Sequence, residues 1–510
     1  MQYRNPVISG CYPDPSICRA GDAYYLVCSS FQFFPGVPLF ESRDLINWKQ
    51  IGHVLTQPSQ LPLQGADSVG GIYAPTIRYH QGRFYMVTTN VTNGGHFFVW
   101  TDDIYGEWSE PVWVHQEGID PSLFFEDGKT YFMSNGSDEQ GSCILQCEID
   151  PETGEQLTEP RSIWRGTGGR FLESPHLYHI GKYYYLLASE GGTEYGHMVV
   201  YARGGSPYGP FEAYAGNPVL TNRNEGGYLL QGCGHADLVE DFSGNWWMVH
   251  LGFRQIHRWM MFHITGREVC LVPVTFQPDG WFTAGENGTV RLLMQTDRIP
   301  DSVRQECRTH FTFADTEAGK EWVFLQNPHP ECCRFSPESV SLQGLEIPLS
   351  SESDSPAWIG IRQKETQFRL SVTVGVSAQE AGVTVYMTGR QHYDLCVRKT
   401  PDGRCALLRR AQLGTLIHEE PVFQLPDGTK SVSLFIQGEQ TEYRFRASAG
   451  GREYLLGTLE AKYLSSETAG NFTGVMLALY AVSTGCGTGI RSDFTDFSLV
   501  YTPTGQCPAP

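Results

Sequence analysis

The sequence has little charge and no long apolar run. Only 18% of its 510 residues are charged, and the net charge is −19. This acidity argues against nucleic acid or an anionic membrane as a partner, but it is compatible with a neutral ligand. The longest uncharged span, residues 470–490, is apolar only in its middle part, VMLALYAV, which indicates a buried strand and not a membrane span. We therefore expect no nucleic-acid or membrane partner.

Cysteine is also scarce for this length, and the fourteen cysteines are scattered. Neither Cys143 with Cys147 nor the adjacent Cys332 and Cys333 form a paired metal-ligand signature, so we expect reduced and mostly buried thiols. The opening MQYRNPVISG lacks the basic start and apolar stretch of an export signal. The expected location is cytoplasmic. No phosphate loop, dinucleotide fingerprint or nucleophilic-serine elbow stands out.

What the sequence does contain is a five-fold internal repeat. Five short motifs share a Pro-Ser-like pair, and we call the residue before each pair the anchor of its repeat. The anchors are 60, 46, 54 and 61 residues apart. The motifs are YPDPS, IYAPTI, GIDPSL, FLESPHL and GCGHADL, and their anchors are Asp14, Ala74, Asp120, Ser174 and His235.

Each anchor is followed by a turn glycine and then by an aromatic-rich segment. A unit of about 50 residues with a strand, a tight turn and a second strand is typical of a β-propeller blade. Because blades are arranged radially, equivalent positions of their inner strands converge on one axis. Asp14 and Asp120 are equivalent, and Glu173 is offset by one residue, so three carboxylates should meet there. The turn glycines are Gly21, Gly82, Gly128, Gly181 and Gly244.

The pattern changes near residue 300. A polar connector, TDRIPDSVRQE, is followed by short alternating segments such as VTVYMTG and TEYRFRAS, separated by turn dipeptides. This pattern predicts an antiparallel β-sandwich. The expected protein is all-β, with a five-bladed β-propeller over residues 1–300 and a sandwich over residues 310–503 that contributes to the pocket.

Three carboxylates on one axis match the needs of glycoside hydrolysis. The reaction requires an acid for the leaving oxygen and a carboxylate that activates water or attacks directly, and the surroundings must push their pKa values apart. An isolated Asp-Pro often only shapes a turn. Two Asp-Pro pairs at equivalent blade positions, with Glu173 almost in register, favour a functional role over a structural one. Acidic groups gathered in one place are costly to bury unless they have a task.

These motifs, together with SSFQFFPGVPLFESRDLINW, APTIRYH and GREV, resemble glycoside hydrolase family 43, most closely its β-xylosidases with a C-terminal β-sandwich. The resemblance covers nearly the whole chain. It implies a five-bladed propeller that inverts anomeric configuration. By the same resemblance, Asp14 is the general base, Asp120 the pKa modulator and Glu173 the general acid.

The resemblance also implies a set of residues that bind the sugar. Arg267 would reach the sugar subsites, although it could instead form a surface pair with Glu268. His235 would lie beneath the pocket, either as a hydrogen-bonded inner-strand residue or beside a water or cation. No cofactor is required, with a Ca²⁺ ion on the axis near His235 as an alternative. Phe31, Tyr73, Ala74, Thr193 and Phe472 complete the predicted substrate-binding residues.

One position departs from the family pattern. Relatives commonly have Trp before the Ala-Pro pair, whereas this chain has Tyr73, which leaves the fine substrate preference open.

The main hypothesis is an exo-acting β-1,4-xylosidase that acts on small oligosaccharides, with α-L-arabinofuranosidase activity as a side activity. The alternatives are a retaining fructan or sucrose hydrolase and a non-catalytic carbohydrate-binding propeller. Homo-oligomerisation is left open.

Overall fold

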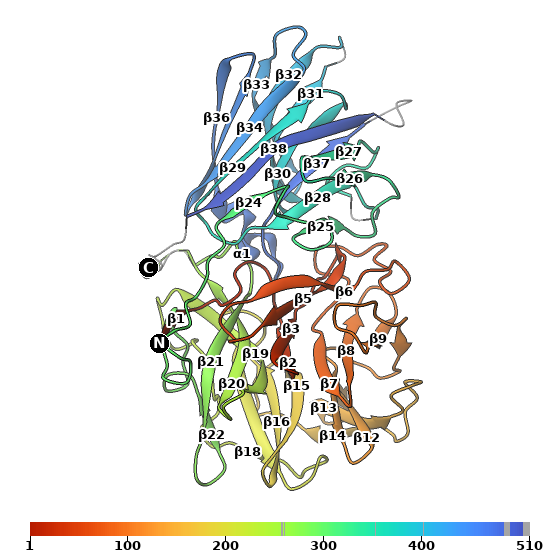
Figure 1. Cartoon of the computed structure of the whole chain (residues 1–510), viewed down its shortest axis with the longest axis vertical. Coiled ribbons are helices and arrows are strands. Elements are labelled where there is room, and N and C mark those ends of the chain that lie inside the picture. The colour runs from red at the N-terminus through yellow and green to blue at the C-terminus, as the bar shows by residue number, and fades with distance from the viewer. Residues whose placement is uncertain (257–258, 260, 352, 401, 484–489, 503–510) are drawn as a thin grey trace.

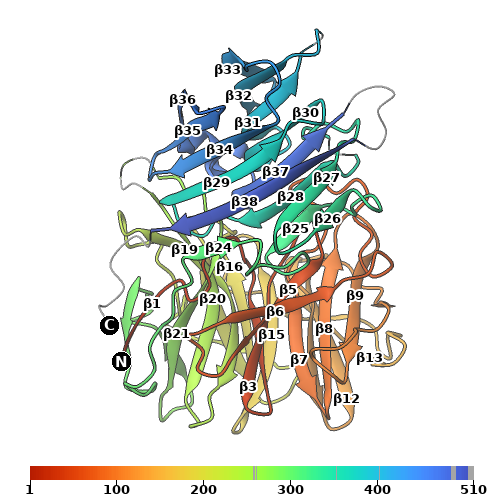
Figure 2. The same ribbon diagram turned by 45° about the horizontal axis from the view of Figure 1, so that its top comes forward.

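The chain folds into two β-domains, one above the other (Figures 1 and 2). The computed structural model describes residues 1–510 except 257–258, 260, 352, 401, 484–489 and 503–510. Apart from two short helical turns, the elements are strands, and the named strand pairings are antiparallel. The prediction of an all-β propeller followed by a sandwich is confirmed. Over the described residues, no helix has the length and apolar character needed to cross a membrane.

The N-terminal domain is a propeller of five four-stranded sheets. Its five inner strands, β2, β7, β11, β15 and β19, contact one another in a closed ring. In a separate two-stranded sheet, β1 (Gln2–Arg4) pairs with β23 (Leu293–Gln295), so the start of the chain is tied to the end of the domain. The blades consist of β2 (Ser16–Ala20), β3 (Ala23–Val27), β5 (Gly36–Ser42) and β6 (Lys49–Leu55); β7 (Thr76–His80), β8 (Arg83–Asn90), β9 (Gly95–Thr101) and β10 (Val112–Trp113); β11 (Ser122–Glu126), β12 (Lys129–Asp138), β13 (Gly141–Ile149) and β14 (Arg161–Trp164); β15 (Glu173–Ile180), β16 (Tyr183–Glu190), β17 (Met198–Gly204) and β18 (Glu212–Ala213); β19 (Leu230–Glu240), β20 (Trp246–Arg254), β21 (Glu268–Phe276) and β22 (Phe282–Ala284).

The sequence repeats correspond to the first two strands of each blade. The predicted turn glycines join those strands, and all five have positive φ. At two of these turns the preceding residue, Gln81 or Asp127, is left-handed as well, as a tight two-residue hairpin turn requires. The aromatic segments form the second strands, which pack between neighbouring blades.

Four of the five anchors share an unusual backbone conformation. Asp14, Asp120, Ser174 and His235 have φ values of 57°, 55°, 52° and 48°. Left-handed backbone is uncommon for residues other than glycine and often marks functional sites. In the fourth blade the left-handed residue is Ser174, so the carboxylate is supplied by the residue before it. This explains the one-residue offset of Glu173.

The C-terminal domain is a sandwich of two eight-stranded sheets with an apolar core between them. The short helix α1 (Ser466–Ala469), which follows η1 (Ala461–Leu464) in the chain, lies at the junction with the propeller (Figure 1). One sheet contains β24 (His310–Thr312), β26 (Cys333–Phe335), β27 (Ser339–Gln343), β29 (Phe368–Gly375), β34 (Ser431–Gly438), β35 (Glu442–Ala449), β36 (Arg452–Glu460) and β38 (Arg491–Tyr501). The other contains β4 (Phe33–Phe34), β25 (Trp322–Leu325), β28 (Ala357–Arg362), β30 (Glu380–Thr388), β31 (Gln391–Lys399), β32 (Cys405–Leu413), β33 (Leu416–Gln424) and β37 (Met476–Val482).

Strand β4 comes from the propeller and joins the two domains. Phe34 pairs with Phe324, and Phe33 pairs with Leu325, so the first blade extends a sandwich sheet. Phe33 is buried in a cluster with Trp358 and other sandwich residues. Because β4 begins two residues after Phe31, this pairing places Phe31 at the boundary between the domains.

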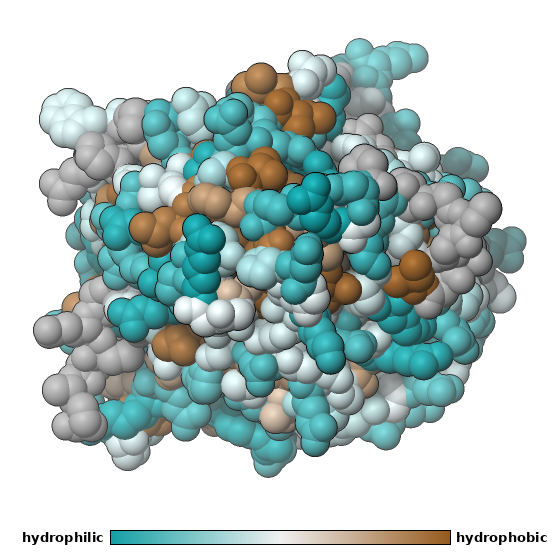
Figure 3. Space-filling view, turned by 90° about the horizontal axis from the view of Figure 1, so that it is seen from above, coloured by the Kyte–Doolittle hydropathy of each residue, from teal (hydrophilic) through white to brown (hydrophobic). Residues whose placement is uncertain are grey.

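The outer end of the sandwich has a mixed surface. Seen from above, apolar residues form separate clusters among hydrophilic ones (Figure 3).

The described cysteines are free, and most are buried, as expected. Homo-oligomerisation and cytoplasmic location stay predictions.

Candidate active site

Asp14 lies at the start of the first blade and is buried. Its Oδ1 accepts a hydrogen bond from Arg267 Nη1 at 2.8 Å, and its Oδ2 accepts one from Ser29 Oγ at 2.5 Å. Burial alone would raise the pKa of Asp14, but Arg267, His235 and the Ser29 hydrogen bond outweigh it and hold the pKa below its usual range. Asp14 is therefore ionised at neutral pH.

Asp120 and Glu173 behave in the opposite way. Burial, followed by the negative charges of Glu173 and Asp14, raises the pKa of Asp120, although Ser174 N–H donates to its Oδ2 at 3.1 Å. Burial and the charge of Asp14 raise the pKa of Glu173 to about 7. Since the charge of one carboxyl acts on the other, they titrate together. Glu173 can thus carry a proton near neutral pH while Asp14 does not.

His235 lies between two of the carboxylates. Its Nδ1 is 3.6 Å from Asp14 Oδ1 and 4.0 Å from Asp120 Oδ2, and its backbone N–H donates to Ser189 Oγ at 2.7 Å. Burial lowers the pKa of His235, so its imidazole is neutral near pH 7. The ring faces the acidic cluster.

Arg267 is a buried pocket residue and not part of a surface pair. It is only 4% exposed, and Glu268 pairs instead with Arg254 at 2.7 Å. Besides Asp14, Arg267 donates to Thr193 Oγ1 at 2.7 Å and, through Nε, to the backbone oxygen of Phe472 at 3.1 Å. One guanidinium therefore joins the base, the loop after β16 and the sandwich.

Three aromatic rings form an apolar wall beside this guanidinium. The ring centroids of Phe31 and Tyr73 are 5.7 Å apart, and Phe472 is 5.5 Å from Phe31 and 6.0 Å from Tyr73. The Tyr73 hydroxyl donates to Val69 O at 2.7 Å, so its polar tip is engaged by the backbone. Ala74 is buried at the second anchor. The predicted residues, including Phe472 from the sandwich, thus come together at one end of the propeller axis.

Sequence reasoning missed Ser29. It is buried at the end of the first blade's second strand, and its backbone N–H donates to Pro13 O at 3.0 Å. That bond places the Ser29 hydroxyl beside Asp14. The only sequence signal is the pair Ser29-Ser30 directly after the apolar strand, which by itself is indistinguishable from a loop.

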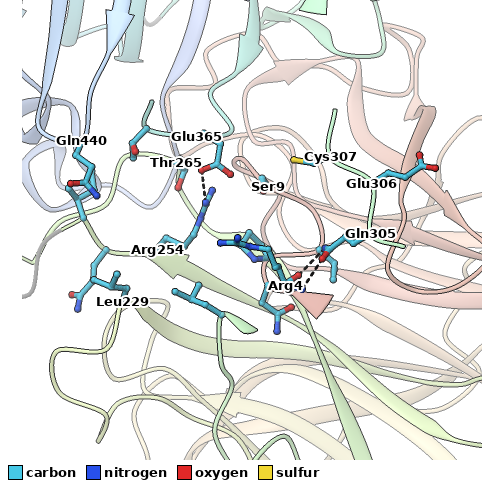
Figure 4. Close-up of a pocket in the computed structure, with 17 residues that line it drawn as sticks. Arg4, Ser9, Leu229, Arg254, Thr265, Gln305, Glu306, Cys307, Glu365 and Gln440 are labelled. Carbon is cyan, nitrogen blue, oxygen red and sulfur yellow. Dashed lines mark hydrogen bonds and ion pairs between the residues drawn. The ribbon is translucent and has the colours of Figure 1, made fainter. Parts of the chain in front are cut away.

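Cavities between described residues lie along the domain boundary. One, of about 220 Å³, is lined by Thr193, Arg267 and Phe472 of the predicted site but by none of the three carboxylates. A second, of about 200 Å³, is lined by the N-terminal segment, the connector, the propeller and the sandwich, and includes the ion pair of Arg254 with Glu365 (Figure 4). None of the predicted site residues lines this second cavity, so we assign the chemistry to the carboxylate cluster.

The surroundings of His235 offer little to a metal ion. The carboxylates nearest to it already accept hydrogen bonds from Arg267 and Ser174. Across the part of the chain that the structure describes, no group of three or more His, Cys, Asp or Glu side chains is arranged to hold a metal. The axial Ca²⁺ ion stays a prediction.

Comparison with known families gives two matches that follow the domain division. Residues 3–282 match the model of glycosyl hydrolases family 43, and residues 310–500 match the β-xylosidase C-terminal concanavalin A-like domain.

Whole-chain relatives carry both domains. The Bacteroides ovatus protein named non-reducing end α-L-arabinofuranosidase BoGH43B is 40% identical, with 98% of this chain and 94% of that protein covered. A xylosidase/arabinosidase from Butyrivibrio fibrisolvens is 34% identical over 97% of this chain and 98% of its own.

Solved structures agree with these sequence matches. The B. ovatus xyloglucan-locus GH43B structure superposes with a TM-score of 0.91 at 38% identity, covering 98% of this chain and 100% of that one. The xylan β-1,4-xylosidase of Bacillus halodurans gives a TM-score of 0.90 at 28% identity, with 98% and 100% covered.

Proposed function

The chain belongs to glycosyl hydrolase family 43, and we propose that it removes single terminal pentose units, β-D-xylosyl or α-L-arabinofuranosyl, from the non-reducing end of short oligosaccharides. The predicted glycosidase class is confirmed by the family match. Relatives named for xylosidase and for arabinofuranosidase activity support both sugars. The retaining fructan-type hydrolase and the non-catalytic propeller are not favoured.

The observation that carries the proposal is the opposite direction of two pKa shifts in one pocket. Asp14 is held ionised by Arg267, whereas Glu173 has a pKa of about 7. A glycosidase needs this division of one base and one acid at the same pH.

In the proposed reaction, Asp14 takes a proton from a water molecule as that water attacks the anomeric carbon. Glu173 donates its proton to the leaving oxygen as the glycosidic bond breaks. The attack comes from the face opposite the leaving group, so the product has inverted configuration. Asp120 is coupled to the acid, because the negative charge of Glu173 raises the pKa of Asp120 and the two carboxyls titrate together.

The aromatic wall supports exo action on one sugar. Phe472 of the sandwich packs against Phe31 and Tyr73 of the propeller and closes the pocket on that side. Aromatic rings suit the C–H faces of a pentose, while Arg267 and His235 supply polar contacts. A pocket that is closed in this way holds one chain end.

Anomer-resolved NMR of the first product tests the mechanism. Hydrolysis of a β-xyloside should release α-xylose first, and initial release of β-xylose would overturn inversion. A panel of aryl pentosides, hexosides and sucrose tests the substrate class. Turnover of sucrose or fructans in preference to both pentosides would favour the retaining alternative.

A further inference from the structure

Phe171 is an exposed aromatic residue directly beside the proposed acid. It lies two residues before Glu173, is 56% exposed, and has a left-handed backbone with φ of 54°. The next residue, Leu172, is buried in the blade core. An aromatic residue is uncommon in left-handed backbone, and such strain persists only where surrounding contacts enforce it.

The loop over residues 165–172 is held in place by a buried carboxylate. Glu190, at the end of β16, accepts hydrogen bonds from Thr167 N and Thr167 Oγ1, both at 2.6 Å, and from Gly169 N at 3.2 Å. Glu190 is fully buried. These bonds fix a glycine-rich loop so that Phe171 has a defined position although its ring faces solvent.

The ring also touches the loop that supplies Thr193. A Cβ atom added to Gly192 would lie 3.0 Å from the Phe171 ring, so the ring rests on this glycine. Arg170 lies over the ring at 5.1 Å from its centroid and pairs with Glu194. Phe171 thus lies two residues before the acid in the chain and touches Gly192, the residue before the Arg267 partner Thr193.

We propose that Phe171 is the platform on which the leaving-group sugar rests during hydrolysis. The acid must contact the glycosidic oxygen, so the departing sugar lies on the Glu173 side of the pocket. An exposed ring in that position offers an apolar surface to the C–H face of a neutral sugar, and the neighbouring Arg170 guanidinium offers donors to its hydroxyl groups. This inference rests on the proposed function.

The test compares substrates with and without a leaving-group sugar. Phe171→Asn removes the ring while keeping a residue that tolerates left-handed backbone. The ratio of kcat/KM for xylobiose to kcat/KM for β-D-xylosyl fluoride should fall about tenfold, the usual size of an aromatic contact. Phe171→Tyr, which keeps a ring, should restore the ratio to within about twofold of wild type.

Phe242 provides a matched control. It is also exposed, lies under Arg19 at 5.4 Å, and belongs to the β19–β20 turn of the fifth blade, at the end of β19 that is opposite the anchor His235. Phe242→Asn should leave the ratio unchanged. An equal loss on both substrates in Phe171→Asn, or no loss on xylobiose, would overturn the platform role.

The proposed function and this inference can fail separately. Wild-type hydrolysis of a pentoside tests the function, and only the ratio among variants tests Phe171. If the wild type releases arabinose instead of xylose, the same comparison uses an arabinofuranosyl-xylose disaccharide and methyl arabinofuranoside. A wild type that hydrolyses neither pentoside overturns both.

Discussion

Removing the charge of Arg267 should move the whole pH profile to higher pH. Its Nη1 is 2.8 Å from Asp14 Oδ1, and both side chains are buried. An opposite charge this close lowers a carboxyl pKa by about 1–3 units. In Arg267→Met the burial of Asp14 is offset only by His235 and the Ser29 hydrogen bond, so its pKa should rise by a similar amount.

The direction in which each limb of the pH profile moves follows from the role of the group that sets it. Asp14 must be ionised, so the acidic limb of kcat/KM lies at its pKa and should rise by about 1–3 pH units in the Met variant. Glu173 must be protonated, so the basic limb lies near its pKa of about 7. Arg267 also lowers the pKa of Glu173, so the basic limb should move upward too.

The assay is kcat/KM for an aryl pentoside with an activated leaving group, measured from pH 3 to pH 10. Arg267→Lys is the control, because it keeps the positive charge but loses the planar fork that reaches Thr193 and the Phe472 backbone. The Lys variant should lose activity without a comparable displacement of the limbs. An acidic limb that stays in place in Arg267→Met would refute the reasoning that this ion pair sets the pKa of the base.

Three further predictions concern the acid, the modulator and the wall. Glu173→Ala should reduce hydrolysis of xylobiose by about 10²–10⁴-fold but spare much of the rate on an activated aryl pentoside, which needs little protonation; equal losses in steady-state kinetics would remove Glu173 from the acid role. Asp120→Asn should lower activity and move a limb of the pH profile, because Asp120 and Glu173 titrate together, and limbs that both stay in place would contradict the coupling. Phe472→Ala should raise KM for a pentoside about tenfold with a smaller effect on kcat, whereas an unchanged KM would show that the sandwich does not contribute to binding.

The propeller could be predicted because its signals are local and repeated. A strand, a turn glycine and an aromatic strand recur in five units, so each blade is encoded within about 50 residues. Asp14 and Asp120 follow from that register. The one-residue offset of Glu173 is also visible in the sequence, and the left-handed φ of Ser174 confirms that this serine occupies the anchor position.

Contacts between distant segments could not be predicted from the residues alone. The partners Ser29 and Asp14 lie in one blade, but Arg267 reaches Asp14 across 253 residues. Nothing in the segment GREV distinguishes a buried guanidinium from a surface pair with Glu268. The pairing of β4 with β25 is equally remote in sequence, and it is this pairing that fixes the sandwich over the pocket.

The sandwich has a role in the chemistry as well as in the shape of the pocket. Arg267 is held by the backbone oxygen of Phe472 while it neutralises Asp14, so the orientation of the guanidinium depends on the docked domain. Phe472 also packs against Phe31 and Tyr73 of the propeller, so the sandwich completes the aromatic wall. Docking of the sandwich therefore aligns the cation that keeps the base ionised. A propeller without its sandwich would keep all three carboxylates but lose the backbone contact that orients Arg267 toward Asp14.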